Sequence, residues 1–303
     1  MTIDPAHDQT IEWLGLKFSV PSEWQIVQHG VAPEGGRLVL VDRRRERLDL
    51  FWRACSSEPD VDRTLDDQKS RDLLAEPQAS IEPLARRGGW RGFRRHAPGG
   101  DIVTRACRYD AKAARWLEAV IINPAGGADP ADLDLGLLES VALCEPAESS
   151  THWRAFDIDV KTPTGFRLLR AQVRPADITF EFGAFHPRTG APCPARAVIH
   201  RMGMADAWYG GSTEQVLLRD HPKVEFGKFV PDVAGPHAGV AAEGRSPWTP
   251  FGRLLGRNEY LRAVAWHCEP TNAVYCVTTT SRAKTPVMPR DFIVTCCQGA
   301  ARG

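Results

Sequence analysis

The stretch WLGLKFSVPSEW (Trp13–Trp24) stands near the start of this 303-residue chain, and the similar stretch WRAFDIDVKTPTGF (Trp153–Phe166) stands just past its midpoint. Each contains a tryptophan, an alternating apolar strand, a proline, and an aromatic residue three positions after that proline. The tryptophans are 140 positions apart (153 − 13) and the prolines 142 (163 − 21), which predicts a two-residue insertion in the second stretch. A repeat of this kind indicates two copies of one structural unit.

The same order of elements follows both stretches. A hairpin is predicted late in each half, over 102–122 and over 260–280, because two alternating strands flank turn residues such as Asp, Pro and Asn. Apolar spacing and end signals predict helices, which cover 61–76, 132–144, 212–219 and 289–298. This order predicts an α+β fold with two duplicated domains, each an antiparallel sheet covered by helices.

The boundary between the halves is predicted in the polar stretch 145–152, which contains a proline and a run of hydroxyl residues. The first domain then covers residues 1–146 and the second covers residues 147–303. The second domain also carries a Pro-, Gly- and aromatic-rich insertion at about 183–258. A long irregular segment in a compact domain is typical of a functional loop.

An apolar strand that ends in Pro-x-x-aromatic, followed by a meander, a helix, a late hairpin and a terminal helix, resembles the Mog/PsbP-like α/β/α fold. The residues that carry the resemblance are 18–24 and 158–166, and it covers most of both halves. Most members of this superfamily are non-catalytic binding or assembly factors, and the resemblance implies such a role for this chain. It rests on the fold, and a shared fold does not by itself imply a shared function.

The composition is that of a folded globular protein, with 43% hydrophobic and 25% charged residues, which excludes wholesale disorder. Apolar runs are too short for a membrane span. The 38 basic and 38 acidic residues cancel, but residues 1–150 carry 19 − 25 = −6 and residues 151–303 carry 19 − 13 = +6. Because the two halves carry opposite net charges, the acidic half of one copy could attract the basic half of another, and self-association is a possible outcome.

The N-terminal residues contain neither a basic nor an apolar secretory region, which predicts a cytoplasmic location. Eight cysteines are present, and thiols of a cytoplasmic protein are expected to stay reduced.

No nucleophile elbow, zinc-protease motif or phosphate-binding loop occurs in the sequence. We therefore expect a non-catalytic accessory or assembly factor that binds another protein or a larger complex, without a cofactor, although an enzyme is not excluded. The predicted contact is a small apolar face with a neighbouring arginine inside the insertion, where exposed aromatic residues are typical of interaction anchors. Its residues are Trp248, Phe251, Arg253, Leu254 and Leu255.

A metal- or thiol-dependent protein is the first alternative. The predicted hairpin carries two cysteines and a histidine, and the predicted terminal helix carries two further cysteines. These residues are His267, Cys268, Cys276, Cys296 and Cys297. No Cys-x-x-Cys pair is present, and buried structural thiols are the competing interpretation.

A single-stranded nucleic-acid binder is the second alternative, because arginine, glycine and aromatic residues alternate in one segment. The residues are Arg86, Arg87, Trp90, Arg91, Phe93, Arg94 and Arg95. Aromatic rings with neighbouring arginines are typical of surfaces on which bases stack. The segment lies in the acidic half and the pI is about 7.1, which argues against a nucleic-acid partner.

Overall fold

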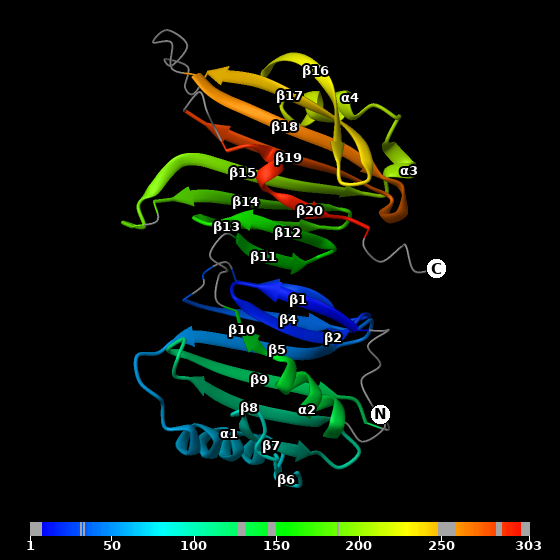
Figure 1. Ribbon diagram of the computed structural model, residues 1–303. Coiled ribbons are helices and arrows are strands. Elements are labelled where there is room, and N and C mark those ends of the chain that lie inside the picture. Colours follow the sequence, from blue (N-terminus) through cyan, green and yellow to red (C-terminus); the bar gives the residue numbers. More distant parts are fainter. Residues whose placement is uncertain are drawn as a thin grey trace. The chain divides into compact units, whose positions relative to one another are not determined.

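A computed structural model describes residues 8–30, 32, 34–125, 131–144, 150–186, 188–247, 258–282 and 287–297. The chain divides into two compact units, residues 1–145 and 146–303, each of which contains one large antiparallel sheet and one small strand group (Figure 1).

The first unit begins with a hairpin and ends with a short strand that returns to it. Its elements are β1 (Asp8–Trp13), β2 (Leu16–Pro21), β3 (Gln25–His29), β4 (Gly35–Val41), β5 (Glu46–Ala54), α1 (Val61–Ala75), β6 (Ser80–Pro83), β7 (Arg91–His96), β8 (Ile102–Asp110), β9 (Arg115–Asn123), α2 (Ala131–Ser140) and β10 (Ala142–Leu143). The small group consists of β10, β2 and β1, in that order.

The second unit also begins with a hairpin, and its last strand returns to that hairpin. Its elements are β11 (Ser150–Ala155), β12 (Ile158–Pro163), β13 (Phe166–Arg174), β14 (Asp177–Phe185), β15 (Pro192–Gly203), α3 (Ala205–Trp208), α4 (Thr213–Asp220), β16 (Glu225–Ala234), β17 (His237–Pro247), β18 (Asn258–Cys268), η1 (Glu269–Thr271), β19 (Ala273–Ser281), η2 (Pro289–Asp291) and β20 (Ile293–Thr295). The small group consists of β11, β12 and β20.

The large sheets of the two units have seven strands each and the same strand order. The first reads β3-β4-β5-β9-β8-β7-β6, and the second reads β13-β14-β15-β19-β18-β17-β16. In each sheet the strand before the helix pairs with the last strand of the later hairpin. The central pair of strands in each sheet, β5 with β9 and β15 with β19, is therefore formed by residues far apart in the chain.

The opening hairpins align without the predicted insertion, which is a correction to the sequence analysis. Trp13 pairs with Leu16, and Ala155 pairs with Ile158, so both strands of the second hairpin lie 142 positions after those of the first. Residues with positive φ fill both two-residue turns, as hairpin turns of this length require. The large aromatic residue has instead moved by two positions along the strand, to Trp153, and stays on the same face.

The two faces of the second unit's sheet are covered by different elements. Helix α4 packs on one face, where Leu217 belongs to a buried cluster with Leu261 and Ala263 of β18. The small strand group packs on the other face, where the Phe182 ring centroid lies 5.4 Å from that of Trp153. The core of this unit is thus formed on both sides of the sheet.

The predicted α+β class with helix-covered sheets is wrong, because strands dominate both units. The described residues form 20 strands but only four α-helices, one of which, α3, has four residues. The predicted helix over 289–298 is a 3-10 turn at Pro289–Asp291 followed by a strand. Ile293, Val294 and Thr295 are β-branched, which favours the extended conformation.

The predicted insertion at 183–258 also contains more regular structure than the composition indicated. Strands β15, β16 and β17 and helices α3 and α4 lie within it. Some of its glycines and prolines lie within paired strands, and others form tight turns, such as Gly235-Pro236 between β16 and β17.

Candidate functional site

The predicted protein-binding anchor, Trp248, Phe251, Arg253, Leu254 and Leu255, lies outside the described residues. The strands on either side of it are described, and their middle portions form part of a groove.

The groove has a volume of about 370 Å³ and lies over β16, β17 and β18, beside the η2 turn. Ala242 and Ala263 belong to the cluster with α4, so their neighbours Ala241 and Val264 point to the opposite face of the sheet. These two small apolar side chains form the floor. The groove therefore opens on the face of the sheet opposite α4.

Apolar and charged side chains alternate on the groove walls. Val230 of β16 is 50% exposed, and Met288, which precedes η2, is 40% exposed. Arg290 pairs with Asp232 across the groove, and the Arg262 Nε lies 2.8 Å from Glu243 Oε1. An apolar floor inside a charged rim can take up an apolar side chain of a partner.

The free edge of the sheet at β16 is protected against strand addition. Its register shifts between Phe226 and Phe229, and Lys228 and Pro231 lie on the same strand. Bulges, lysines and prolines are common devices that block pairing at a sheet edge. A partner is therefore better accommodated in the groove than along this edge.

The arginine- and aromatic-rich segment of the first unit is engaged in internal contacts. Trp90 and Phe93 are buried, and the Trp90 Nε1 donates a hydrogen bond to the Leu138 carbonyl at 2.7 Å. Neither ring is placed to stack on a base. The charged residues contact carboxylates on nearby elements, in the pairs Arg87–Glu139, Arg91–Asp62, Arg94–Asp134 and Arg95–Glu76, while Arg86 is exposed.

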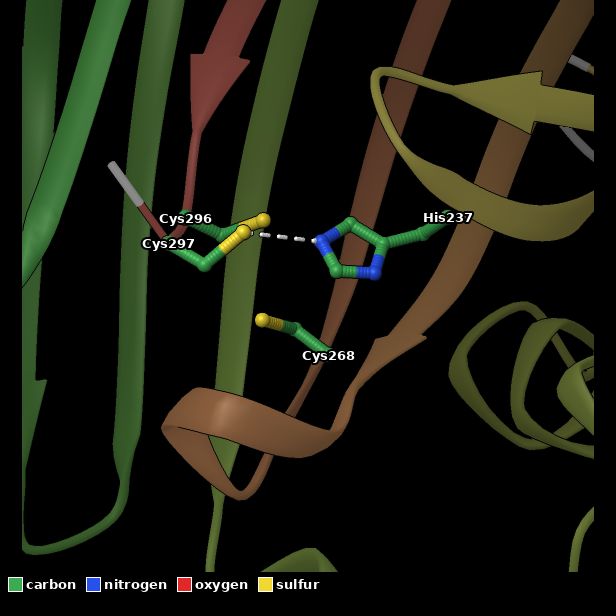
Figure 2. A group of neighbouring side chains, drawn as sticks. All are labelled: His237, Cys268, Cys296 and Cys297. Carbon is green, nitrogen blue, oxygen red and sulfur yellow. Dashed lines mark hydrogen bonds between the residues drawn. The ribbon is translucent and has the colours of Figure 1, made fainter. Parts of the chain in front are cut away.

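Three of the five residues predicted for a metal or thiol site come together, and a different histidine joins them. The ligand atoms of His237, Cys268, Cys296 and Cys297 all lie within 4.8 Å of one another (Figure 2). The Cys297 Sγ lies 3.3 Å from the His237 Nε2.

His267 and Cys276 lie elsewhere. His267 is next to Cys268 on β18 and so points to the other face of the sheet, where its ring centroid is 4.7 Å from that of Tyr209. Cys276 belongs to the buried cluster under α4, and burial raises the pKa of its thiol to about 12.

Each member of the thiol–imidazole cluster (His237, Cys268, Cys296 and Cys297) is positioned by a strand end. His237 begins β17 after the turn Gly235-Pro236, in which Gly235 has φ +59°, and glycine at this place is typical of a type II′ hairpin turn. Cys268 ends β18 and is fully buried. Cys296 and Cys297 follow β20, which pairs with β12.

Burial dominates the electrostatics of the cluster. Burial, together with the neighbouring thiols Cys268 and Cys297, raises the pKa of Cys296 to about 12, against an opposing effect of the Trp266 indole. Burial and the nearby His267 lower the pKa of His237. Glu269 acts in the opposite direction, but the net shift is downward, and a lowered pKa favours the neutral imidazole, whose ring carries a free lone pair.

The sequence could not single out His237 among the nine histidines. No short spacing joins it to a cysteine, since it lies 31 positions before Cys268 and 59 before Cys296. The only local signal is the Gly-Pro turn that places it at the start of a strand.

No helix among the described residues is long and apolar enough to cross a membrane.

No protein-family model and no curated protein matches this chain. Among solved structures, it is similar to the immunity protein TplEi of T6SS from Pseudomonas aeruginosa, complexed with an "L" peptide, at a TM-score of 0.35 and 10% sequence identity. The alignment covers 94% of this chain and 92% of that chain. A likeness of this degree assigns no family, so the function rests on the geometry of this chain's own groove and cluster.

Proposed function

We propose that this chain is a non-catalytic protein-binding factor and that the groove over β16–β18 holds an apolar side chain of its partner. The observation that carries the proposal is the groove's pattern, in which Ala241 and Val264 form an apolar floor and charged pairs form the rim. Exposed Val230 and Met288 flank the floor and lose water contact when a partner binds, which favours association.

The duplication of one ancestral unit is part of the same proposal. The identical strand order of the two large sheets supports it. The Mog/PsbP-like resemblance, the cytoplasmic location and self-association through opposite charge stay predictions from the sequence.

The groove can be tested with two variants on one strand. Val230 and Val233 are both exposed on β16, at 50% and 69%, but they point to opposite faces because they are three positions apart. Val230→Arg places a cation in the groove, whereas Val233→Arg is the matched control outside it. A photo-crosslinking side chain at residue 230, with residue 233 as its control, identifies the partner in the native host.

We expect a defined protein crosslinked from position 230 and at least tenfold weaker binding of that protein to Val230→Arg, with Val233→Arg unchanged. Both variants should keep the wild-type Tm, since the substituted side chains are exposed. Equal binding by the two variants, or no crosslinked protein from position 230, would overturn the proposal.

A further inference from the structure

The thiol–imidazole cluster has the composition and spacing of a structural zinc site. Three cysteines and one histidine form one of the usual ligand sets for tetrahedral Zn²⁺, with ligand bonds of about 2.3 Å to sulfur and about 2.0–2.1 Å to nitrogen. Those bond lengths put tetrahedral ligand atoms about 3.6–3.8 Å from one another. The separations here, 3.3 Å for one pair and at most 4.8 Å for the rest, bracket those values.

The adjacent pair Cys296–Cys297 fits one metal ion because it does not lie in a helix. In a helix, neighbouring side chains diverge by about 100°, which would separate the two sulfur atoms. Here both residues follow β20 in an irregular conformation, and Figure 2 shows their sulfur atoms side by side, facing His237 and Cys268.

A buried donor beside the cluster provides a second observation. The Trp266 Nε1 is buried and has no hydrogen-bond partner among the described residues, and Trp266 lies two positions before Cys268 on β18, so that both side chains point to the same face of the sheet. Donors of this kind surround metal-bound sulfur and stabilise its negative charge.

We propose that His237, Cys268, Cys296 and Cys297 bind one Zn²⁺ ion that anchors the C-terminal segment 287–297 to the large sheet of the second unit. His237 supplies Nε2, the atom that faces Cys297. The three thiols bind as thiolates and release their protons to solvent on binding. The resulting site is closed, with four protein ligands, as expected of a structural rather than a catalytic zinc ion.

The anchored segment also forms a wall of the groove. Met288 and Arg290 line the groove at its start, and Cys296 and Cys297 lie near its end. Without the ion, the described residues of this segment are attached by the three-residue pairing of β20, by contacts of η2 with β18 and β19, by the Arg290–Asp232 ion pair and by the packing of Phe292. The ion links the end of this segment, just after β20, to β17 through His237 and to β18 through Cys268.

The direct test is zinc stoichiometry in the 303-residue chain, measured by elemental analysis after purification with and without added zinc. We expect one zinc per chain with a Kd tighter than about 1 μM. Cys268→Ser, Cys297→Ser and His237→Ala should each weaken binding at least tenfold. Cys193→Ser and His186→Asn are controls outside the cluster and should bind as the wild type does.

A second measurement uses the wild-type chain alone, so its outcome does not depend on whether a variant folds. Alkylation of the wild-type chain, mapped by mass spectrometry, should be at least tenfold slower at Cys296 and Cys297 with zinc than without it. Cys193 in the same sample should be unaffected.

Substoichiometric zinc in the zinc-loaded wild type, equal loss in the control variants, or a disulfide within the cluster in place of zinc would each overturn the proposal. These results are independent of the partner-binding test, because neither the stoichiometry nor the alkylation rate involves the partner.

Discussion

Cys297 and His237 are 60 positions apart in the chain, and their Sγ and Nε2 atoms lie 3.3 Å apart. The contact joins the first residue of β17 to the residues that follow the last strand. It lies on the same face of the sheet as the groove, because His237 and Ala241 are four positions apart on one strand. The segment 287–297 therefore lines the groove near its start and contributes two cysteines to the thiol–imidazole cluster near its end.

Zinc is expected to raise the Tm of the metal-free chain. A ligand that binds only the folded state stabilises it by about 2.7 kcal/mol at 100 times its Kd, which is a shift of roughly 5–10 °C for a unit of this size. Thermal melts followed by circular dichroism measure the shift. In His237→Ala, whose zinc affinity should be at least tenfold lower, the shift should fall to about half of the wild-type shift or less, and an equal shift in that variant would contradict the prediction.

His200 predicts a pH dependence of stability in the second unit. Its Nδ1 lies 2.8 Å from Asp220 Oδ2 and its Nε2 lies 2.8 Å from Asp177 Oδ1. Burial lowers the pKa of His200, but the hydrogen bonds and charges of Asp220 and Asp177 outweigh it, and the pKa is raised above its usual value. The stabilisation is therefore complete below about pH 6.5 and is lost as pH rises through the raised pKa.

Urea unfolding of wild type and His200→Gln over this pH range checks the prediction. We expect the variant to be less stable by about 1–2 kcal/mol at low pH, with the difference shrinking as pH rises. The neighbouring His221 has a pKa that burial and the charge of His200 lower, and its own contribution to stability has the opposite pH dependence. A difference that grew with pH would contradict the assignment.

Asp134 of α2 should be the most sensitive carboxylate of the first unit. It is fully buried, accepts hydrogen bonds from Thr104 and, at 2.8 Å, from Asn123 Nδ2, and lies 3.6 Å from the Nε of Arg94, which is also buried. Asp134→Ala removes a buried carboxylate that accepts two hydrogen bonds and faces a buried guanidinium, and breaking a buried pair of this kind costs about 3–5 kcal/mol. Denaturant unfolding measures the loss.

The control for this prediction is Asp132→Ala on the same helix. Asp132 is exposed, so its removal should change stability by less than about 1 kcal/mol. Similar losses in the two variants would show that the helix, rather than the buried network, carries the effect.

The arginine-rich segment is not expected to bind single-stranded nucleic acid. Both of its aromatic rings are buried, and stacking on exposed rings supplies much of the affinity of such sites. A mobility-shift assay with a single-stranded oligonucleotide at low salt should show no complex. A complex that weakens steeply with added salt would contradict this expectation.

The sequence alone predicted the late hairpins closely. Strands over 102–110 and 115–123, and over 258–268 and 273–281, match alternating apolar patterns that end at turn residues. These features are local, because the backbone conformation of a hairpin depends on side-chain alternation and on the few residues of its turn.

The helix over 289–298 was predicted wrongly because a proline start and a glycine stop were weighed above the β-branched run Ile293–Thr295. The partner strand decides that conformation, since the segment gains backbone hydrogen bonds by pairing with Lys161, Val160 and Asp159 of β12. Pairing over more than 130 positions is not visible in a local pattern.

The sequence by itself determined which residues can supply thiol ligands and where the hairpins turn. Only the tertiary structure decided that His237, rather than His267, faces the thiols of Cys268 and Cys297. The reason is the two-residue periodicity of strands: His267 adjoins Cys268 and points to the opposite face, whereas the pairing of β16, β17 and β18 brings His237 to the same face and the same end. Register over a whole sheet is set by burial of its faces, which involves residues far apart in the chain.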